Sequence, residues 1–431
     1  MNFQEDFLQT VWKYQYFDKN SLQTTEGLSI EVKKIGYHNF HEGPDFLEAQ
    51  VKLGKLDLFG HVEVHRKASD WKSHDHNADQ RYNSVILHVV WEEDKTILRN
   101  DGSKIPTLEL KGKILLDVIR NYERLTSSRD EILCGKLLEK IPPIIQFSML
   151  EKTLIERLEH KSQVLGKILE STNNSWEETA YRWLFQCFGF KTNAATMLKL
   201  AESVPYKILQ KHGNQPQVIE AILLGQADLI PSEALDEYSL FLQKEYDFYQ
   251  KKYRLQKTIH HHEWIMMGVR PQNFPPLRIA QLTQVFNKNP NLFSSVIHHN
   301  EHFDQFKKVF DIETPEYWLY HIKVGVSSQK KSSKKLSPNT LSLLTINFII
   351  PLWYAYGQYI QDSDWKEKCF DLLQEISPEE NFIIRKYGIH LWKAKTSFDS
   401  QGMIGLYHDY CKPKKCLDCK IGQNLLKPER K

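Results

Sequence analysis

The spacing of apolar residues changes at about the end of the first quarter of the chain, and this change constrains the fold more than any other feature. Before it, apolar and polar residues alternate in short runs such as Gly27–Ile35 and Asp45–Leu53, which is typical of half-exposed strands. After it, apolar residues recur every three or four positions, as in Ser148–Leu169, which is typical of amphipathic helices. We therefore predict an α+β protein with a small mixed-sheet domain at residues 1–112 and a large all-helical region at residues 113–431.

The N-terminal domain is predicted to contain a helix, a three-stranded meander, a polar insert and a buried strand. Phe3–Phe17 has helical apolar spacing. The third strand of the meander, Leu56–His65, follows a tight turn at Gly54. The insert, Lys67–Asn83, lacks periodicity and is predicted to be a loop with one helical turn. Ser84–Trp91 is a continuous β-branched and apolar run, as in a strand buried on both faces.

The second and third strands carry acidic residues that the predicted hairpin brings together. A turn centred on Gly54 places Asp45 opposite Glu63, and a turn centred half a residue later shifts the pairing by one. Opposed side chains on one face lie about 5 Å apart, so the two carboxylates are candidate ligands for Mg²⁺ or Mn²⁺. His65 and Lys67 share the strand face of Glu63 and are candidates to assist a metal-bound water.

The insert and the buried strand supply a second set of candidate metal ligands. In an extended chain, His74 and His76 point to one side, and Asp79 adds an oxygen, which gives a set suited to Zn²⁺ or Mn²⁺. Exposed residues in a polar loop more often bind nothing. His88 lies in the buried strand, where a histidine is more often a hydrogen-bonded core residue than a ligand.

Three cysteines near the C-terminus form the sharpest local motif outside the hairpin. Cys411, Cys416 and Cys419 fall within nine residues, a density that indicates a zinc or iron–sulfur site. The fourth ligand is predicted to be Cys134, with His408 as the local alternative. The N-terminus lacks the features of a secretory signal, so we expect reduced thiols and a cytoplasmic protein.

Charge and hydropathy limit the classes of partner. The net charge of +3 is close to neutral, so only a local patch would bind nucleic acid. The Ser/Lys-rich segment Val326–Leu336 and the lysines around the cysteines are candidates, although a solvated basic surface is the commoner explanation. Leu341–Ile360 carries no charged residue and has the length of a membrane span. Its polar residues and Pro351 favour a buried core helix, so we expect no membrane partner.

Two resemblances add to this interpretation. The order of helix, meander, insert and buried strand is similar to the core of the PD-(D/E)XK nucleases, in which a Pro-Asp pair opens the second strand and a Glu-x-Lys motif lies on the third. Pro44-Asp45 and Glu63-Val64-His65 match in place and separation, but His65 stands at the lysine position and Lys67 lies one pleat further on. This resemblance implies a nuclease that depends on Mg²⁺ or Mn²⁺.

The second resemblance spans nearly the whole chain. The motifs that carry it are Glu42-Gly43-Pro44-Asp45-Phe46, Gly60-His61-Val62-Glu63-Val64-His65, Asp70-Trp71, His74-x-His76, Tyr82-Asn83, Leu87-His88-Val89-Val90, Arg270-Pro271-x-Asn273-Phe274-Pro275 and Tyr410-Cys411-x4-Cys416-x2-Cys419-x-Ile421-Gly422. Together they resemble the bacterial family catalogued as domain of unknown function 2851, which implies no activity.

The functional hypothesis that follows is a metal-dependent nuclease or phosphodiesterase that acts on nucleic acid. A non-catalytic nucleic-acid-binding or scaffold protein is one alternative. A zinc-dependent hydrolase that uses the His-x-His loop is the other. The sequence identifies no protein partner.

Overall fold

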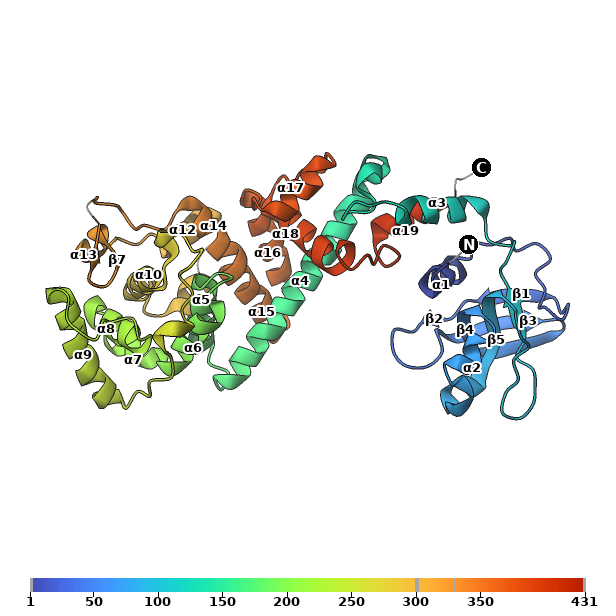
Figure 1. Ribbon diagram of the computed structural model, residues 1–431, viewed down its shortest axis with the longest axis horizontal. Coiled ribbons are helices and arrows are strands. Elements are labelled where there is room, and N and C mark those ends of the chain that lie inside the picture. The colour runs from blue at the N-terminus through green and yellow to red at the C-terminus, as the bar shows by residue number, and fades with distance from the viewer. Residues whose placement is uncertain (1–2, 299–301, 329, 429–431) are drawn as a thin grey trace. The chain divides into compact units, whose positions relative to one another are not determined.

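The chain forms two compact units in the computed structural model, which describes residues 3–298, 302–328 and 330–428 (Figure 1). The first unit comprises residues 1–149, 389–392 and 406–431, and the second comprises 150–388 and 393–405. The predicted boundary after residue 112 therefore lies inside the first unit. The physical reason is that Val118 and Tyr122, beyond the predicted boundary, are buried in the same core as Phe7, and that Leu426 of the cysteine tail is buried there too.

A six-stranded mixed sheet forms the centre of the first unit, as predicted. Its strands run in the order β1-β3-β4-β5-β6, with β2 paired to β3. The β3 strand pairs antiparallel with β1, β2 and β4, whereas β4 with β5 and β5 with β6 are parallel pairs. The strands are β1 (Ile30–Lys34), β2 (Tyr37–His38), β3 (Phe46–Leu53), β4 (Leu56–Lys67), β5 (Val85–Glu92) and β6 (Thr107–Glu109).

The hairpin of β3 and β4 changes register along its length. Next to the turn at Gly54, Val51 pairs with Leu58. Further on, Glu48 adopts a left-handed backbone with φ 55°, and the register shifts by one residue so that Phe46 pairs with Val62. This bulge, which is a common way to re-aim a strand end, leaves Asp45 facing Glu63.

The two faces of the sheet are covered by different segments. The helix α1 (Glu5–Tyr14) lies against β4, and its Phe7 shares a core with Val64. The opposite face is covered by the insert, which forms α2 (Asp70–Ser73), η1 (His76–Ala78) and η2 (Gln80–Ser84) and buries Trp71. The insert is therefore more regular than the predicted loop, because burial of Trp71 and Tyr82 anchors it to the sheet.

The remaining helices of the first unit are α3, η3, the start of α4, η7 and α19. Their bounds are α3 (Leu116–Thr126), η3 (Gly135–Lys140), α4 (Pro143–Ser171), η7 (Tyr407–Cys411) and α19 (Lys420–Leu426). The helix α3 packs beside α19, where Asn121 Nδ2 donates to the Lys427 carbonyl at 3.1 Å.

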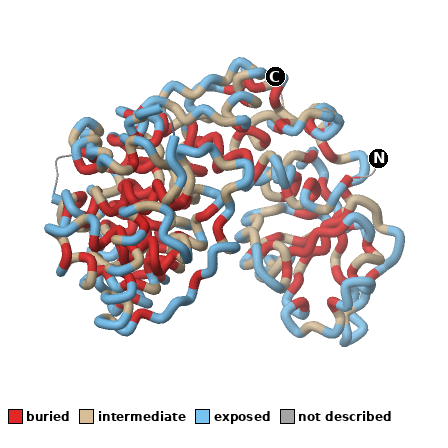
Figure 2. Tube along the Cα trace, turned by 60° about the vertical axis from the view of Figure 1, so that its left-hand side comes forward, coloured by how far each residue is buried: buried red, intermediate tan, exposed pale blue. Residues whose placement is uncertain are grey.

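The second unit is built almost entirely of helices around one apolar core (Figure 2). Beyond α4 they are α5 (Trp176–Phe188), α6 (Ala194–Ser203), α7 (Tyr206–Lys211), α8 (Pro216–Gln226), α9 (Glu237–Tyr253), η4 (His261–Glu263), η5 (Pro271–Asn273), α10 (Pro275–Lys288), α11 (Leu292–Ile297), α12 (Phe303–Val309), α13 (Glu316–Tyr320), α14 (Pro338–Leu344), η6 (Thr345–Ile349), α15 (Ile350–Ile360), α16 (Asp364–Glu375), α17 (Phe382–Ile389) and α18 (Ser397–Leu406). A short hairpin of β7 (His321–Lys323) and β8 (Val326–Ser327) is the exception to the predicted all-helical region.

One helical stretch in the described part of the chain, Pro338–Ile360, is long and apolar enough to cross a membrane. Of its most apolar 18-residue window, 72% is buried within the protein. Burial of this helix does not indicate where in the cell the protein resides. The expected cytoplasmic location therefore stays a prediction.

Candidate metal centre

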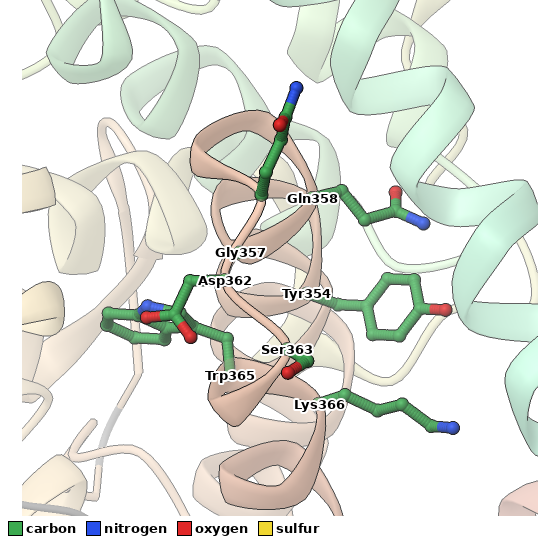
Figure 3. A pocket seen from close by; sticks show the side chains of 8 residues that line it. Tyr354, Gly357, Gln358, Asp362, Ser363, Trp365 and Lys366 are labelled. Atoms are coloured by element: carbon green, nitrogen blue, oxygen red, sulfur yellow. The ribbon is translucent and has the colours of Figure 1, made fainter.

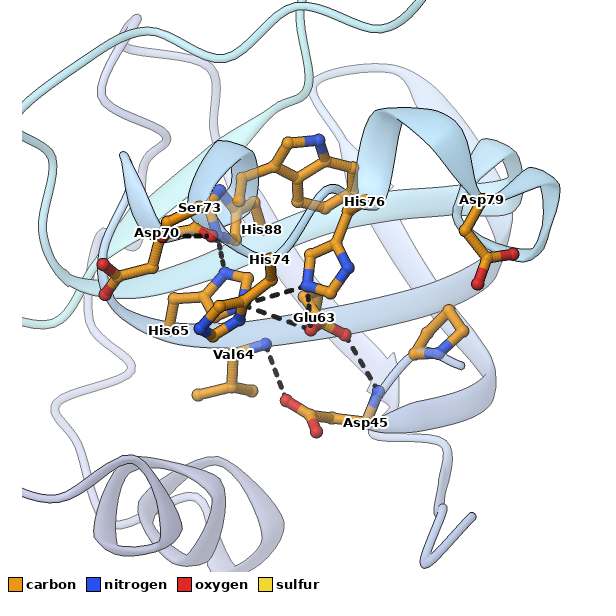
Figure 4. A network of polar contacts seen from close by, with 12 residues as sticks. Asp45, Glu63, Val64, His65, Asp70, Ser73, His74, His76, Asp79 and His88 are labelled. Carbon is orange, nitrogen blue, oxygen red and sulfur yellow. Dashed lines mark hydrogen bonds and ion pairs between the residues drawn. The ribbon is translucent and has the colours of Figure 1, made fainter. Parts of the chain in front are cut away.

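Four side-chain donor atoms converge between the sheet and the insert (Figure 4). Nε2 of His65 lies 3.2 Å from Nδ1 of His74 and 3.2 Å from Nε2 of His76. Oε1 of Glu63 lies 3.4 Å from Nε2 of His65 and 3.2 Å from Nε2 of His76. The three histidines form a group whose donor atoms all lie within 4.8 Å of one another.

Local backbone geometry explains how these side chains meet. Because successive strand residues point to opposite faces, Glu63 and His65 project from β4 toward the insert, while Val64 enters the core under α1. His74 follows α2, and Asp75 then turns the chain with φ 55° so that His76 opens η1. Figure 4 shows the rings of His74 and His76 directed at Glu63 and His65.

The donor spacing suits a single tetrahedral transition-metal ion. With metal–donor bonds of about 2.0–2.1 Å, the edge of a Zn²⁺ tetrahedron is about 3.3 Å, which matches the 3.2–3.4 Å separations among Glu63, His65 and His76 and the 3.2 Å from His65 to His74. Mg²⁺ prefers oxygen ligands at octahedral spacing of about 2.9–3.0 Å between neighbours. Three imidazole nitrogens and one carboxylate oxygen therefore favour Zn²⁺, Mn²⁺ or Fe²⁺ over Mg²⁺.

Burial favours the neutral imidazoles of His65, His76 and His88, and the neutral form is the one that binds metals. His65 and His88 are fully buried, and burial lowers the pKa of His65 to about 2 and that of His88 to about 3. Burial also lowers the pKa of His76. His74 is exposed, so the group is reached from solvent on the side of the insert.

His88 and Asp45 support the four donors from behind. Nε2 of His88 lies 2.9 Å from Nδ1 of His65, as expected of a residue that orients a metal-binding histidine. The N–H of Asp45 donates to Oε2 of Glu63 at 3.0 Å, and Oδ2 of Asp45 accepts from the N–H of Val64 at 3.0 Å. This reciprocal pair of hydrogen bonds fixes the Glu63 side chain against the end of β3.

The carboxyl groups of the site have raised pKa values. Burial, followed by the charge of Glu63, raises the pKa of Asp45 to about 7. Burial raises the pKa of Glu63 to about 8. Glu5, in the first turn of α1, has its pKa raised to about 7 by burial and then by Asp45. Both Glu5 and Gln9, which donates to Oδ1 of Asp45 at 2.9 Å, are absent from the residues predicted from the sequence.

Besides His88, which contacts Nδ1 of His65, three of the ligands and catalytic residues predicted in the N-terminal domain lie outside the group of four donors. Asp79 accepts from Nε and Nη2 of Arg81 and from its backbone N–H, and it is the N-cap residue of η2. Lys67 is exposed and in register with Glu92. The carboxylate of Asp45 already accepts hydrogen bonds from Gln9 and Val64, so Asp45 lies next to the four donors and is not one of them. Figure 4 shows Asp45 and Asp79 directed away from the histidines.

The four predicted cysteine ligands all belong to the first unit. Cys411 ends η7, Cys416 packs against Gly422, where no side chain would fit, and Cys419 precedes α19. Burial, followed by the charges of the three tail thiols, raises the pKa of Cys134 well above its usual range.

One hydrogen bond joins the chain near Cys134 to the chain near Cys411. Oη of Tyr407 donates to Oε2 of Glu131 at 2.7 Å. His408, the local alternative for the fourth ligand, is exposed. These contacts place Cys134 close to the tail.

Comparisons with known proteins identify the family. No curated protein and no solved structure matches the chain. The model of a family described as a protein of unknown function, DUF2851, matches residues 5–382. That range includes every residue of the candidate metal centre and ends before the cysteine tail. Because the match covers most of the chain, this protein belongs to the DUF2851 family.

Proposed function

We propose that this protein is a metal-dependent phosphodiesterase whose metal ion is bound by Glu63, His65, His74 and His76. The observation that supports the proposal is the convergence of the Glu63, His65 and His76 donors at 3.2–3.4 Å from one another, with His74 3.2 Å from His65. Neutral imidazoles and one carboxylate are the ligands of Zn²⁺ and Mn²⁺ sites that activate water.

The metal would lower the pKa of a bound water and so supply hydroxide near neutral pH. For this a coordination position must stay free beside the protein ligands. Three donors, from Glu63, His65 and His76, are buried, and the exposed His74 marks the solvent side of the site, from which water would reach the metal.

Glu5 is the residue best placed to move protons at this site. It lies in the first turn of α1, half-buried, and is close enough to Asp45, His74 and His76 for their charges to influence its pKa, which is about 7. A carboxyl with a pKa near the working pH is suited to general acid–base catalysis. Asp45 acts as a positioning residue, because its N–H holds Glu63.

The choice of phosphodiesters as substrates rests on two supports. The first is the resemblance of Pro44-Asp45 and Glu63 to the nuclease motif. The second is the register of β3 and β4, which leaves Asp45 facing Glu63. We propose nucleic acid as the substrate class on this basis.

A second candidate function follows from the number of protein donors. Four protein ligands complete a tetrahedral zinc shell, and closed shells of this kind are typical of structural sites. The protein would then be a non-catalytic nucleic-acid-binding or scaffold protein with a structural metal in its first unit.

One experiment separates these functions. The protein is reconstituted with Zn²⁺ or Mn²⁺ and assayed for hydrolysis of bis(p-nitrophenyl) phosphate and of single- and double-stranded DNA. We expect turnover that falls to background in His76→Ala. The matched control is His61→Ala, since His61 lies on β4 but accepts from the N–H of Glu48 instead. Tight metal binding without turnover on any substrate would contradict the phosphodiesterase and favour the structural alternative.

For the cysteine tail we propose a second, structural metal centre bound by Cys134, Cys411, Cys416 and Cys419. The support is the packing of the tail in the first unit, where Leu426 is buried in the N-terminal core and Tyr407 bonds Glu131. Thiolate ligands suit both Zn²⁺ and an iron–sulfur cluster. Such a centre would fasten the end of the chain to the sheet domain.

A further inference from the structure

A positively charged pocket lies in the second unit, between η5, α10 and the segment from Ser333 to Leu343. Its volume is about 310 Å³. Four cationic side chains and no acidic side chain line it; the cations are Arg270, Arg278, Lys334 and Lys335.

Arg278 is the central residue of this pocket. Its side chain is only 4% exposed, and its guanidinium stacks over the ring of Phe190, with 4.7 Å from Cζ to the ring centre. Nη1 donates to Oε1 of Gln281 at 2.8 Å, and Nη2 donates to Oδ1 of Asn273. A guanidinium has five N–H donors, and Nε has no partner among the described atoms.

The charge of Arg278 is not balanced by any residue that the structure describes. Its two side-chain partners are neutral amides, and within the described part of the chain no ion pair links it to a carboxylate. Burial alone lowers its pKa to about 10. Buried charges are otherwise paired in proteins because an unpaired one is strongly unfavourable, so the missing partner is an anion.

The surrounding contacts make a built site around Arg278. Gln281, which accepts from Arg278, donates its amide to the Lys334 carbonyl at 2.6 Å. This bond draws the Ser/Lys-rich segment into the unit, and Lys334 is only 7% exposed, in contrast to the solvated loop predicted from its composition. Lys335 lies at the rim and forms an exposed ion pair with Asp311 at 3.7 Å.

A second hollow in the same unit has a different charge pattern. It lies at the turn between α15 and α16, has a volume of about 260 Å³, and is lined by Tyr354, Gln358, Asp362 and Lys366 among others (Figure 3). One acid and one base balance each other there, and no buried charge lines it.

We propose that the Arg278 pocket binds the phosphate group of a small phosphate ester. Phosphate offers several oxygen acceptors and a double negative charge, which match the free N–H groups of Arg278 and the lysine and arginine residues at the rim. A carboxylate offers a single charge to four cations. The pocket lies in the second unit, so this site is independent of the metal centre proposed above.

Isothermal titration calorimetry and ³¹P NMR with the full-length protein test the site. The probes are inorganic phosphate, AMP and acetate, in chloride buffers of matched ionic strength. We expect one saturable site for phosphate and for AMP, and at least tenfold weaker binding of acetate. Absence of saturable phosphate binding, or equal binding of acetate, would overturn the proposal.

Substitutions in the pocket complete the test. Arg278→Met is expected to abolish phosphate binding, and Arg270→Gln with Lys335→Gln to weaken it at least tenfold. The rim pair is exposed, so it remains informative if Arg278→Met fails to fold. Arg385→Gln is the matched control, because Arg385 is an exposed arginine of α17 outside the pocket. Unchanged phosphate affinity in the rim pair would contradict the assignment, as would an equal loss in the control.

Discussion

Nδ1 of His65 lies 2.9 Å from Nε2 of His88, and the opposite nitrogen of the same ring faces three other donor atoms. His65 therefore connects the buried strand β5 to the candidate metal centre. A histidine that binds a metal through Nε2 carries its proton on Nδ1, and His88 is in place to accept it.

Substitution of His88 tests this support. His88→Leu removes the acceptor and is expected to weaken Zn²⁺ binding 10- to 100-fold, the usual cost of losing an orienting partner. His88→Gln keeps an acceptor oxygen and should lose less. Competition with a chromophoric chelator measures both affinities. Identical affinities of the wild type and His88→Leu, with the fold intact by circular dichroism, would argue against a role for His88.

A comparison of Asp79 with His76 tests which loop residues bind the metal. Asp79→Asn should leave metal affinity unchanged, since its carboxylate is engaged by Arg81. His76→Ala removes a donor whose Nε2 lies 3.2 Å from both Glu63 and His65, so it should reduce affinity at least 100-fold. Titration of the two variants with Co²⁺, followed by visible absorption, decides the matter. The reverse ranking would support the ligand set predicted from the sequence.

From the sequence, the strand framework of this site can be predicted more accurately than the set of residues that form the site. The alternation of β4 places Glu63 and His65 on one face, which follows from local periodicity. The pairing of Asp45 with Glu63 does not, because the register next to the turn would pair Asp45 with Val64 and only the bulge at Glu48 shifts it by one residue. The residues in the middle of the insert are different, because the positions of His74, His76 and Asp79 depend on how Trp71 and Tyr82 pack on the sheet.

Residues brought by distant segments are not accessible from local patterns. Glu5 joins the site because α1 docks on β4, and the only local signal was an acidic residue in the first turn of an amphipathic helix. The tail shows the same limit. Its return to the first unit depends on burial of Leu426 with Phe7, which no periodicity encodes.

Glu220 gives the second unit a defined pH dependence. It is fully buried, accepts from Tyr238 at 2.8 Å and from Trp318 Nε1 at 2.6 Å, and burial raises its pKa to about 7. A carboxyl with a raised folded-state pKa contributes its full stability below pH 4.5, and this contribution is lost as pH rises toward 7. The shift corresponds to about 3 kcal/mol.

Glu220→Gln keeps an acceptor for both donors but does not titrate. We expect the free energy of unfolding of the variant, relative to wild type, to increase by up to about 3 kcal/mol between pH 5 and pH 7.5. Thermal and urea unfolding at the two pH values measure this difference. A difference that is the same at both pH values would show that Glu220 is ionised in the folded protein.

The cysteine tail has a spectroscopic signature. Anaerobically purified protein should show either broad absorption near 400 nm with bound iron and sulfide, or bound zinc without visible absorption. The double variant with Cys416→Ser and Cys419→Ser should lose that metal, and its tail should become sensitive to proteolysis. The control variant Cys369→Ser, whose substitution lies in the core of the second unit, should keep the metal. Metal-free tail thiols in freshly purified protein would contradict the structural centre.

The metal content of the protein tests the central claim most directly. Wild type and His74→Ala/His76→Ala are purified side by side and analysed by inductively coupled plasma mass spectrometry, with His41→Ala/His61→Ala as the matched control. Subtraction removes any metal held by the cysteines. We predict that the His74/His76 variant loses one equivalent of zinc, manganese or iron per chain and that the control loses none. Equal metal content in all three proteins would contradict the proposed centre at Glu63, His65, His74 and His76.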